Sequence, residues 1–159
     1  MVPLIERCRD IALRDTTAIA VPVDNPYGLP DGRYAFLESY CNLPLDMCDC
    51  RRVFLNVVYD GPVTQGSVVL LATIGYGWED RTFYKEWSHS TNCDKELIDY
   101  IKGPILELTG TGTKYSEAVL KLFRDSLLDD RAFAGRLQKH YQMFKTVQSA
   151  GYTGCKKRR

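Results

Sequence analysis

Hydrophobic positions recur along this chain with two different periods, which predict different elements. Near the N-terminus apolar residues are spaced three and four positions apart, a pattern that predicts a helix over 3–15. From residue 33 the spacing becomes two, and β-branched and aromatic residues predominate. The pattern predicts three strands, over 33–41, 52–59 and 67–76. Their short connections, such as the turn Asp60-Gly61-Pro62, favour an antiparallel meander.

Helical spacing returns in the second half of the chain. Two short helices are predicted over 79–87 and 94–102, a third over 115–128, and a last one that begins at 129. Strands followed by helices are typical of the α+β class, in which helices pack on an antiparallel sheet. We therefore predict an α+β fold, with a three-stranded antiparallel sheet and C-terminal helices packed on one face.

Length and composition fit one domain. The chain has 159 residues, of which 45% are hydrophobic, and this is enough to form one core. We expect a single domain over 1–150 and a flexible basic tail over 151–159. The 21 Lys and Arg residues nearly balance the 20 Asp and Glu residues, so no global field attracts nucleic acid or anionic lipid. A partner of that kind would need a local patch.

The sequence predicts a cytoplasmic protein that does not span a membrane. Its longest apolar run, Val68 to Ile74, has the length of a strand, whereas a membrane helix needs about 20 residues. Charged residues such as Glu6 and Arg7 interrupt the N-terminus, which is not typical of a secretory signal. In a reducing compartment, clustered cysteines are more often metal ligands or redox centres than disulfides.

Three of the six cysteines lie within ten positions, on the two shoulders of a predicted hairpin. Cys41 ends the first strand, and Cys48 and Cys50 precede the second. Antiparallel neighbours lie roughly 5 Å apart, so these sulfur atoms can converge on one ion with metal–sulfur bonds of about 2.3 Å. Three thiolates favour zinc among the common intracellular metals. The sequence therefore predicts a zinc hairpin over 41–50.

A structural zinc ion usually has four ligands, so one more is needed. His140 is the first choice, because it lies on the apolar stripe of the last helix and faces the body of the protein. Cys93, with His89 four residues before it, is the second choice, and Cys155 is the third. His140 on its own would indicate a buried histidine that only forms hydrogen bonds, and the three thiols that need a partner make the ligand interpretation equally plausible.

A redox role for the cysteines is the alternative interpretation. A C-x-C pair can form a strained disulfide, and Arg51 and Arg52 would lower the pKa of a neighbouring thiol such as that of Cys50. This interpretation leaves Cys41 without a role. Metal binding accounts for all three thiols and is preferred.

Three segments together resemble a known family: YC-x6-C-x-CRRV, ATIGYGWEDRTFYKEW and RLQKHYQMFK. They are similar to an uncharacterised family of bacterial proteins with a C-x(n)-C-x-C zinc hairpin, and they span most of 33–145. Some members end in a zinc motif of the type that ends the secretion ATPase. The resemblance implies a zinc hairpin and His140, and it implies no particular reaction. This chain ends in GYTGCKKRR, with one cysteine instead of a full ligand set, and the resemblance therefore implies a terminal zinc module that is missing or reduced here.

The expected function is that of a zinc-binding protein, with structural zinc in an interaction or nucleic-acid-associated module. Protein or nucleic acid are the expected partners. The alternative is an enzyme that uses zinc with an open coordination position, or a reactive thiol at Cys48 or Cys50. No G-x-S-x-G or H-E-x-x-H motif occurs, so generic hydrolase chemistry has little support. Aromatic residues within 75–87 could stack on single-stranded nucleic acid, although core packing is the commoner role of such residues.

Overall fold

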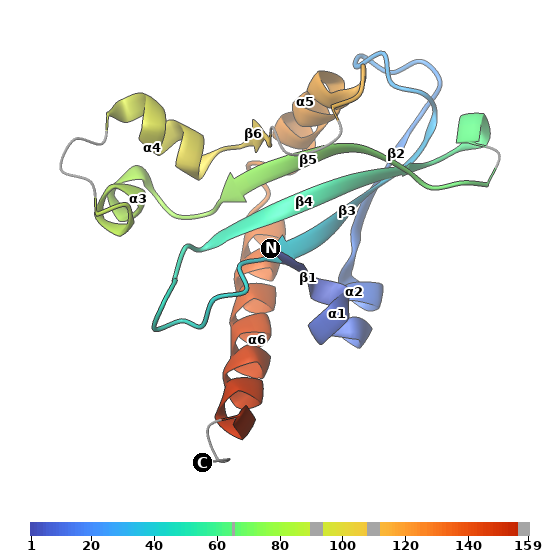
Figure 1. Ribbon diagram of the computed structural model, residues 1–159. Coiled ribbons are helices and arrows are strands. Elements are labelled where there is room, and N and C mark those ends of the chain that lie inside the picture. Colours follow the sequence, from blue (N-terminus) through green and yellow to red (C-terminus); the bar gives the residue numbers. More distant parts are fainter. Residues whose placement is uncertain (65, 90–93, 108–111, 156–159) are drawn as a thin grey trace.

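The centre of the molecule is an antiparallel sheet, seen in a computed structural model that describes residues 1–64, 66–89, 94–107 and 112–155. The strands follow the order β1-β3-β4-β5-β6, and β2 pairs with the same edge of β3 as β1 does (Figure 1). The six strands are β1 Val2–Pro3, β2 Thr17–Val21, β3 Gly32–Tyr40, β4 Arg52–Asp60, β5 Val69–Gly77 and β6 Ile105–Leu106. The α+β class is therefore confirmed.

The predicted number of strands was wrong, because the described part of the chain forms a sheet of six strands and not three. The three long strands, β3, β4 and β5, match the predicted segments to within two residues at each end. β1 and β6 are two residues long, too short to show a period in the sequence. β2 contains two alanines and lies before a stretch rich in proline and glycine, so its pattern did not separate it from the loop.

The described residues form six α-helices around or beside the sheet: α1 Leu4–Arg7, α2 Arg9–Asp15, α3 Arg81–Trp87, α4 Lys95–Lys102, α5 Ser116–Ser126 and α6 Arg131–Cys155. The predicted helix over 3–15 is divided at Cys8, whose φ of −130° and ψ of 58° are not helical. α6 includes 151–155 of the predicted flexible tail, and 156–159 lie outside the described residues. None of the helices that the structure describes combines the length and the hydrophobicity that a bilayer crossing requires.

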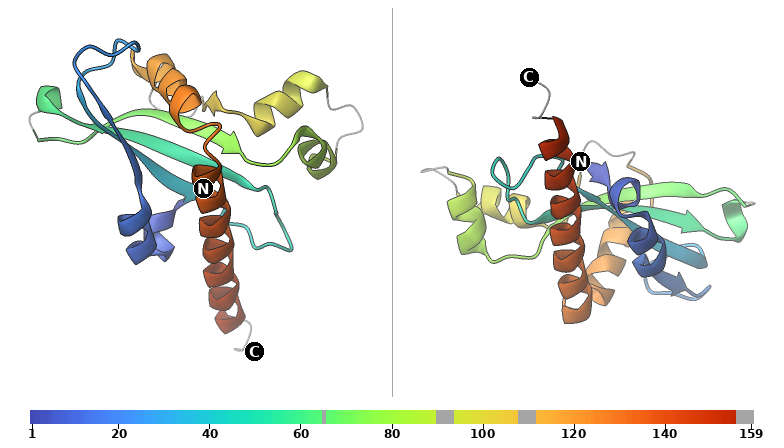
Figure 2. Two further views of the ribbon diagram at one scale, coloured as in Figure 1. Left: turned by 180° about the vertical axis from the view of Figure 1, so that it is seen from behind. Right: turned by 90° about the horizontal axis from the view of Figure 1, so that it is seen from below.

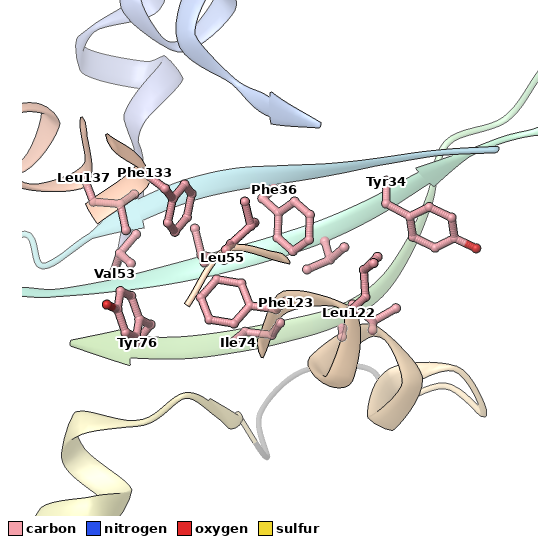
Figure 3. Packing of buried hydrophobic residues seen from close by; sticks show 14 of the residues in the cluster. Tyr34, Phe36, Val53, Leu55, Ile74, Tyr76, Leu122, Phe123, Phe133 and Leu137 are labelled. Atoms are coloured by element: carbon pink, nitrogen blue, oxygen red, sulfur yellow. The ribbon is translucent and has the colours of Figure 1, made fainter. Parts of the chain in front are cut away.

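α5 and α6 cover one face of the sheet, whereas α3 and α4 lie beyond the end of β5 and α1 and α2 lie at the β3 edge (Figures 1 and 2). The prediction that the C-terminal helices all pack on one face therefore holds only for the last two. Phe123 of α5 illustrates the packing, because its ring centre lies 6.1 Å from that of Phe36 and 5.9 Å from that of Phe133 (Figure 3). Each fully buried side chain of this size contributes about 1.5–3 kcal/mol.

The connection between β3 and β4 lies beside α6 in Figures 1 and 2. The last paired residues of this hairpin are Tyr40 and Val53, so both ends of the connection begin next to each other. The Tyr40 ring also packs against the rings of Tyr141 and Phe144, with centres 5.8 Å and 5.6 Å apart. The hairpin end and α6 thus form one packed unit that carries the cysteines.

Candidate metal centre

The structure brings Cys41, Cys48 and Cys50 together. Their Sγ atoms all lie within 4.8 Å of one another. Three sulfurs around a tetrahedral ion with bonds of about 2.3 Å would be separated by roughly 3.8 Å, so only small side-chain movements are needed for shared coordination. Among the described residues no other group of three or more histidine, cysteine, aspartate or glutamate side chains meets this condition. The arrangement can hold a metal ion.

Local backbone structure turns the loop back on itself so that the second pair of cysteines reaches the first. The carbonyl oxygen of Pro44 accepts hydrogen bonds from the backbone N–H groups of Met47 and Cys48, at 3.0 Å and 2.9 Å. Arg51 then has a φ of 46°, in the left-handed region that non-glycine residues adopt rarely. This turn separates Cys50 from the regular pairing of β4, which begins at Arg52.

The strained turn at Arg51 is fixed by contacts from two directions. Its guanidinium lies 3.0 Å from a carboxylate oxygen of Asp49 and 3.1 Å from one of Glu79. The same group lies over the ring of Phe83, 4.5 Å from the ring centre. Tyr84 donates a hydrogen bond of 2.8 Å to the carbonyl oxygen of Arg51. Side chains of α3 therefore support the Cys41–Cys50 loop near Arg51, on the side opposite to the tip of that loop.

α6 fastens the loop through polar side chains. The Lys145 ammonium is fully buried and donates hydrogen bonds to the carbonyl oxygens of Leu43, at 2.5 Å, and Cys48, at 3.1 Å. Gln148, one turn further along, donates its amide N–H to the carbonyl oxygen of Asn42. Buried ammonium groups are tolerated only when they are well compensated. An ion held by three thiolates would leave a net charge of −1, which the Lys145 ammonium can balance.

Burial has a larger effect on the pKa values of Cys48 and Cys50 than the neighbouring cations have. It raises the pKa of Cys50 to about 12, although a backbone hydrogen bond from Arg52 and the charge of Lys145 act in the opposite direction. Burial and a hydrogen bond to Cys41 also raise the pKa of Cys48. The net shift of the Cys50 pKa is therefore opposite to the one expected from the neighbouring arginines, because burial outweighs the lowering contribution of Arg52. Without metal these two thiols hold their protons at neutral pH, and a bound ion would displace them.

His140 lies with two carboxylates and is not part of the sulfur cluster. Its Nδ1 atom lies 2.8 Å from Oε2 of Glu38, and its Nε2 atom lies 3.3 Å from Oδ2 of Asp15. Only 1% of the side chain is exposed. Carboxylates accept hydrogen bonds, so an imidazolium that donates from both nitrogens fits this position. The structure thus directs both ring nitrogens of this predicted ligand to other partners.

Among the remaining candidates for a fourth ligand, His89 has a described side chain, and it does not join the cluster. His89 is exposed in the turn after α3. Cys93 lies outside the described residues. Cys155 is the last residue of α6. Three of the four predicted metal ligands therefore meet, and the described residues contribute no fourth one.

Two polar side chains that the sequence analysis did not use are central to the site. Lys145 lies four positions after Tyr141 and Gln148 three positions after that, so both continue the apolar stripe of α6. A charged residue on a buried stripe signals a specific partner. Glu38 carried a similar signal, because it lies on the same side of β3 as Tyr34 and Phe36.

Comparisons with protein-family models, with curated proteins and with solved structures find no match to this chain. The cluster of Cys41, Cys48 and Cys50 does not by itself identify a family. The resemblance to bacterial zinc-hairpin proteins thus stays a prediction. The function is argued below from the geometry alone.

Replacing His140 by Gln tests its position between the carboxylates. Burial disfavours the charged ring, but hydrogen bonds and charges from Glu38 and Asp15 outweigh it and raise the pKa of His140. A raised pKa stabilises the fold fully below the unfolded value of about 6.5, and this contribution is lost as the pH rises through the folded value. We expect the variant to be less stable by about 1–3 kcal/mol at pH 6 and the difference to shrink at pH 9.

Chemical unfolding of both proteins at the two pH values measures this difference, and the metal content of each is determined in parallel. Unchanged metal content is expected. A folded His140→Gln variant that loses its metal would instead identify the histidine as a ligand.

Proposed function

We propose that this protein binds one zinc ion through Cys41, Cys48 and Cys50, and that the ion has a structural role. It would lock the connection between β3 and β4 in the conformation that packs on α6. The observation that carries this proposal is the convergence of the three sulfurs within 4.8 Å of one another, from both shoulders of one hairpin. Sulfur ligands select soft or borderline metals, and zinc is the one that structural thiolate sites most often contain.

The surroundings of the cluster support a structural role over a reactive thiol. Cys50 is buried, and its raised pKa is the opposite of what a nucleophilic cysteine requires. Lys145 and Gln148 already hold the backbone of the loop to α6. A metal ion would link Cys41 on one shoulder of the hairpin to Cys48 and Cys50 on the other. Its binding free energy would add to the stability of the folded state.

The outer side of the same loop supports a role in protein interaction. Leu43, Leu45 and Met47 are exposed to 46%, 48% and 66% of their maximum. Three large apolar side chains close together on one short loop are typical of a contact surface, and nucleic acid would require basic residues there instead. Zinc would fix the backbone that presents these side chains. We therefore favour a protein partner for this module.

A zinc enzyme is the second candidate function. It is favoured by one observation, namely that the described residues contribute three ligands, which would leave the fourth coordination position to water or a substrate. Cys41 and Cys48 are partly exposed, so this position would be accessible from solvent. Four protein ligands would indicate a structural ion, and three with a bound water would indicate catalysis.

Metal analysis combined with differential alkylation tests the proposal. Protein purified without added metal is expected to contain one equivalent of zinc. Mass-spectrometric mapping of alkylated cysteines, before and after chelation, is expected to show protection of Cys41, Cys48 and Cys50 that chelation removes, whereas Cys8 is unaffected by it. If Cys93 is protected in the same way, this result would identify it as the fourth ligand. A metal-free, folded protein whose three thiols react freely would refute the proposal.

A further inference from the structure

One face of the sheet, called the open face below, carries no helix over β4 and β5 among the described residues. α5 and α6 pack on the opposite face, so β4 and β5 lie in front of both helices in Figure 1 and behind them in the left view of Figure 2. An antiparallel sheet with one face in water normally places polar residues on that face. Cross-strand partners share a face, so the strand register identifies the residues of the open face.

The open face is largely apolar. Leu37 and Leu70 expose 41% and 36% of their surface on it, and Ile5 and Leu13 of the flanking helices α1 and α2 expose 46% and 62%. A hollow of about 290 Å³, lined by Ile5, Leu13 and Leu37 among others, joins the helices to the strands. A continuous apolar patch on a folded protein marks an interaction surface. Further apolar side chains of the open face are those of Ala35, Phe54 and Val58.

Three polar side chains cross the middle of the open face in one row. The Thr73 hydroxyl donates a hydrogen bond of 2.9 Å to Oδ1 of Asn56, and Nδ2 of Asn56 donates one of 3.4 Å to Oγ of Ser39. Covering a polar group costs free energy unless that group is paired. Because each of these side chains already has a partner, a second apolar surface can cover the row at a small cost.

The charged groups of the open face lie at its two ends and balance each other. Arg33 and Asp60 are cross-strand partners at one end. At the other end the side chains of Arg52 and Glu107 lie over Gly75, with their closest N and O atoms 3.3 Å apart. Since each end carries both signs of charge, a copy of the same face meets complementary charges and no net repulsion.

The width of the open face favours a second sheet over a single helix as its partner. Neighbouring strands lie about 4.8 Å apart, so β3 to β6 span about 14 Å, whereas a helix with its side chains is about 10–12 Å wide. β3, β4 and β5 have nine residues each. They form a flat area of about 430 Å². β2, α1, α2 and the relief of the side chains enlarge it toward the roughly 600 Å² per partner of the smaller stable interfaces.

We infer that this protein forms a two-fold symmetric dimer in which the open faces of two copies pack on each other. A two-fold interface uses the same patch on both copies, which a neutral apolar face with charges at both ends satisfies. Two sheets packed in this way lie about 10 Å apart, with their strands at about −30°. The dimer would bury Leu37 and Leu70. The sulfur cluster shares no residue with this interface.

Sedimentation equilibrium of the full chain tests the dimer. An interface of this size corresponds to a dissociation constant on the order of 10 µM. The mass is therefore expected to rise from that of one chain toward that of two between about 1 µM and about 300 µM. NMR on a mixture of labelled and unlabelled copies is expected to show contacts between copies at the methyl groups of Leu37, Val58 and Leu70. A monomer over the whole range, which would leave the face to a different protein, or contacts only elsewhere, would overturn the inference.

Leu37→Lys is the main variant, because one copy already exposes this side chain and the charge would be buried only in the dimer. It is expected to weaken association at least a hundredfold, and Leu70→Lys on another strand is expected to do the same. Leu97→Lys on α4, where the leucine is 45% exposed, is the matched control and should dimerise as the native protein does. Circular dichroism confirms that each variant is folded.

Two further variants separate this interface from the metal loop. Cys50→Ser is expected to remain dimeric, so failure of the dimer and failure of the metal site are distinguishable. Leu45→Lys, at the exposed side of the loop, is expected to leave association unchanged. Folded Leu37→Lys and Leu70→Lys proteins that dimerise with native affinity, or dissociation by Leu45→Lys alone, would contradict the inference.

Discussion

Replacing Cys50 by Ser is expected to reduce the affinity for zinc at least a hundredfold and to remove most of the stabilisation that zinc provides. A serine hydroxyl does not replace a thiolate as a zinc ligand, so the site would retain two sulfurs. If zinc is supplied at a thousand times the dissociation constant of the native protein, it stabilises the fold by about 4 kcal/mol. The variant would lose most of this contribution.

Denaturant unfolding with and without a chelator measures both parts of this expectation. Cys8→Ala is the matched control, because Cys8 is another buried, free cysteine that lies outside the sulfur cluster. The control is expected to respond to zinc as the native protein does. If Cys50→Ser were stabilised by zinc as strongly as the native protein, the three-sulfur site would be wrong.

Replacing Lys145 by Met is expected to lower the free energy of unfolding by about 3 kcal/mol or more. Methionine preserves the unbranched apolar part of the side chain but leaves the carbonyl oxygens of Leu43 and Cys48 without their charged donor. Each such hydrogen bond contributes about 1.5–3 kcal/mol, and a buried acceptor without a partner carries its own desolvation cost. The removal of positive charge beside the thiols would also weaken zinc binding.

Lys139→Met on the exposed side of α6 is the control, with an expected change below about 0.5 kcal/mol. Amide hydrogen exchange adds a local measurement, because loss of the Lys145 contacts should release the Cys41–Cys50 loop before the rest of the sheet. A Lys145→Met protein as stable as the native one, with an equally protected loop, would show that α6 does not fasten this connection.

The site was predictable as far as local structure determines it. Alternation in the long strands predicted a hairpin, and the hairpin placed Cys41 opposite Cys48 and Cys50 without knowledge of the rest of the chain. Antiparallel pairing brings both shoulders within a few ångström of each other, so the convergence follows from two neighbouring strands. The structure bears out this part of the interpretation.

The role of His140 depends on the tertiary structure. The α6 stripe correctly predicted that this histidine faces inward, but two inward-facing partners were available in sequence, a thiol cluster and a carboxylate. Glu38 lies 102 positions earlier on β3, and the crossing of β3 and α6 decides which partner the ring meets. Neither the period of the strand nor that of the helix contains this information. A lone glutamate on an aromatic strand face was the only sequence signal.

The two shortest strands and the break in the first helix could not be predicted from periodicity. β1 and β6 have two residues each, and their pairing depends on β3 and β5 being in place already. The break at Cys8 divides a helix whose apolar spacing continues unchanged through it. Pairing and packing with the sheet therefore decide these elements, and periodicity does not.

Zinc-edge X-ray absorption on the native protein loaded with one equivalent of zinc tests the central claim most directly. The proposed centre predicts three sulfur neighbours at about 2.3 Å, or four if Cys93 joins them. The same measurement on Cys50→Ser is expected to show one sulfur fewer. A spectrum of the native protein that contains only nitrogen and oxygen neighbours, or one sulfur at most, would contradict zinc binding by Cys41, Cys48 and Cys50.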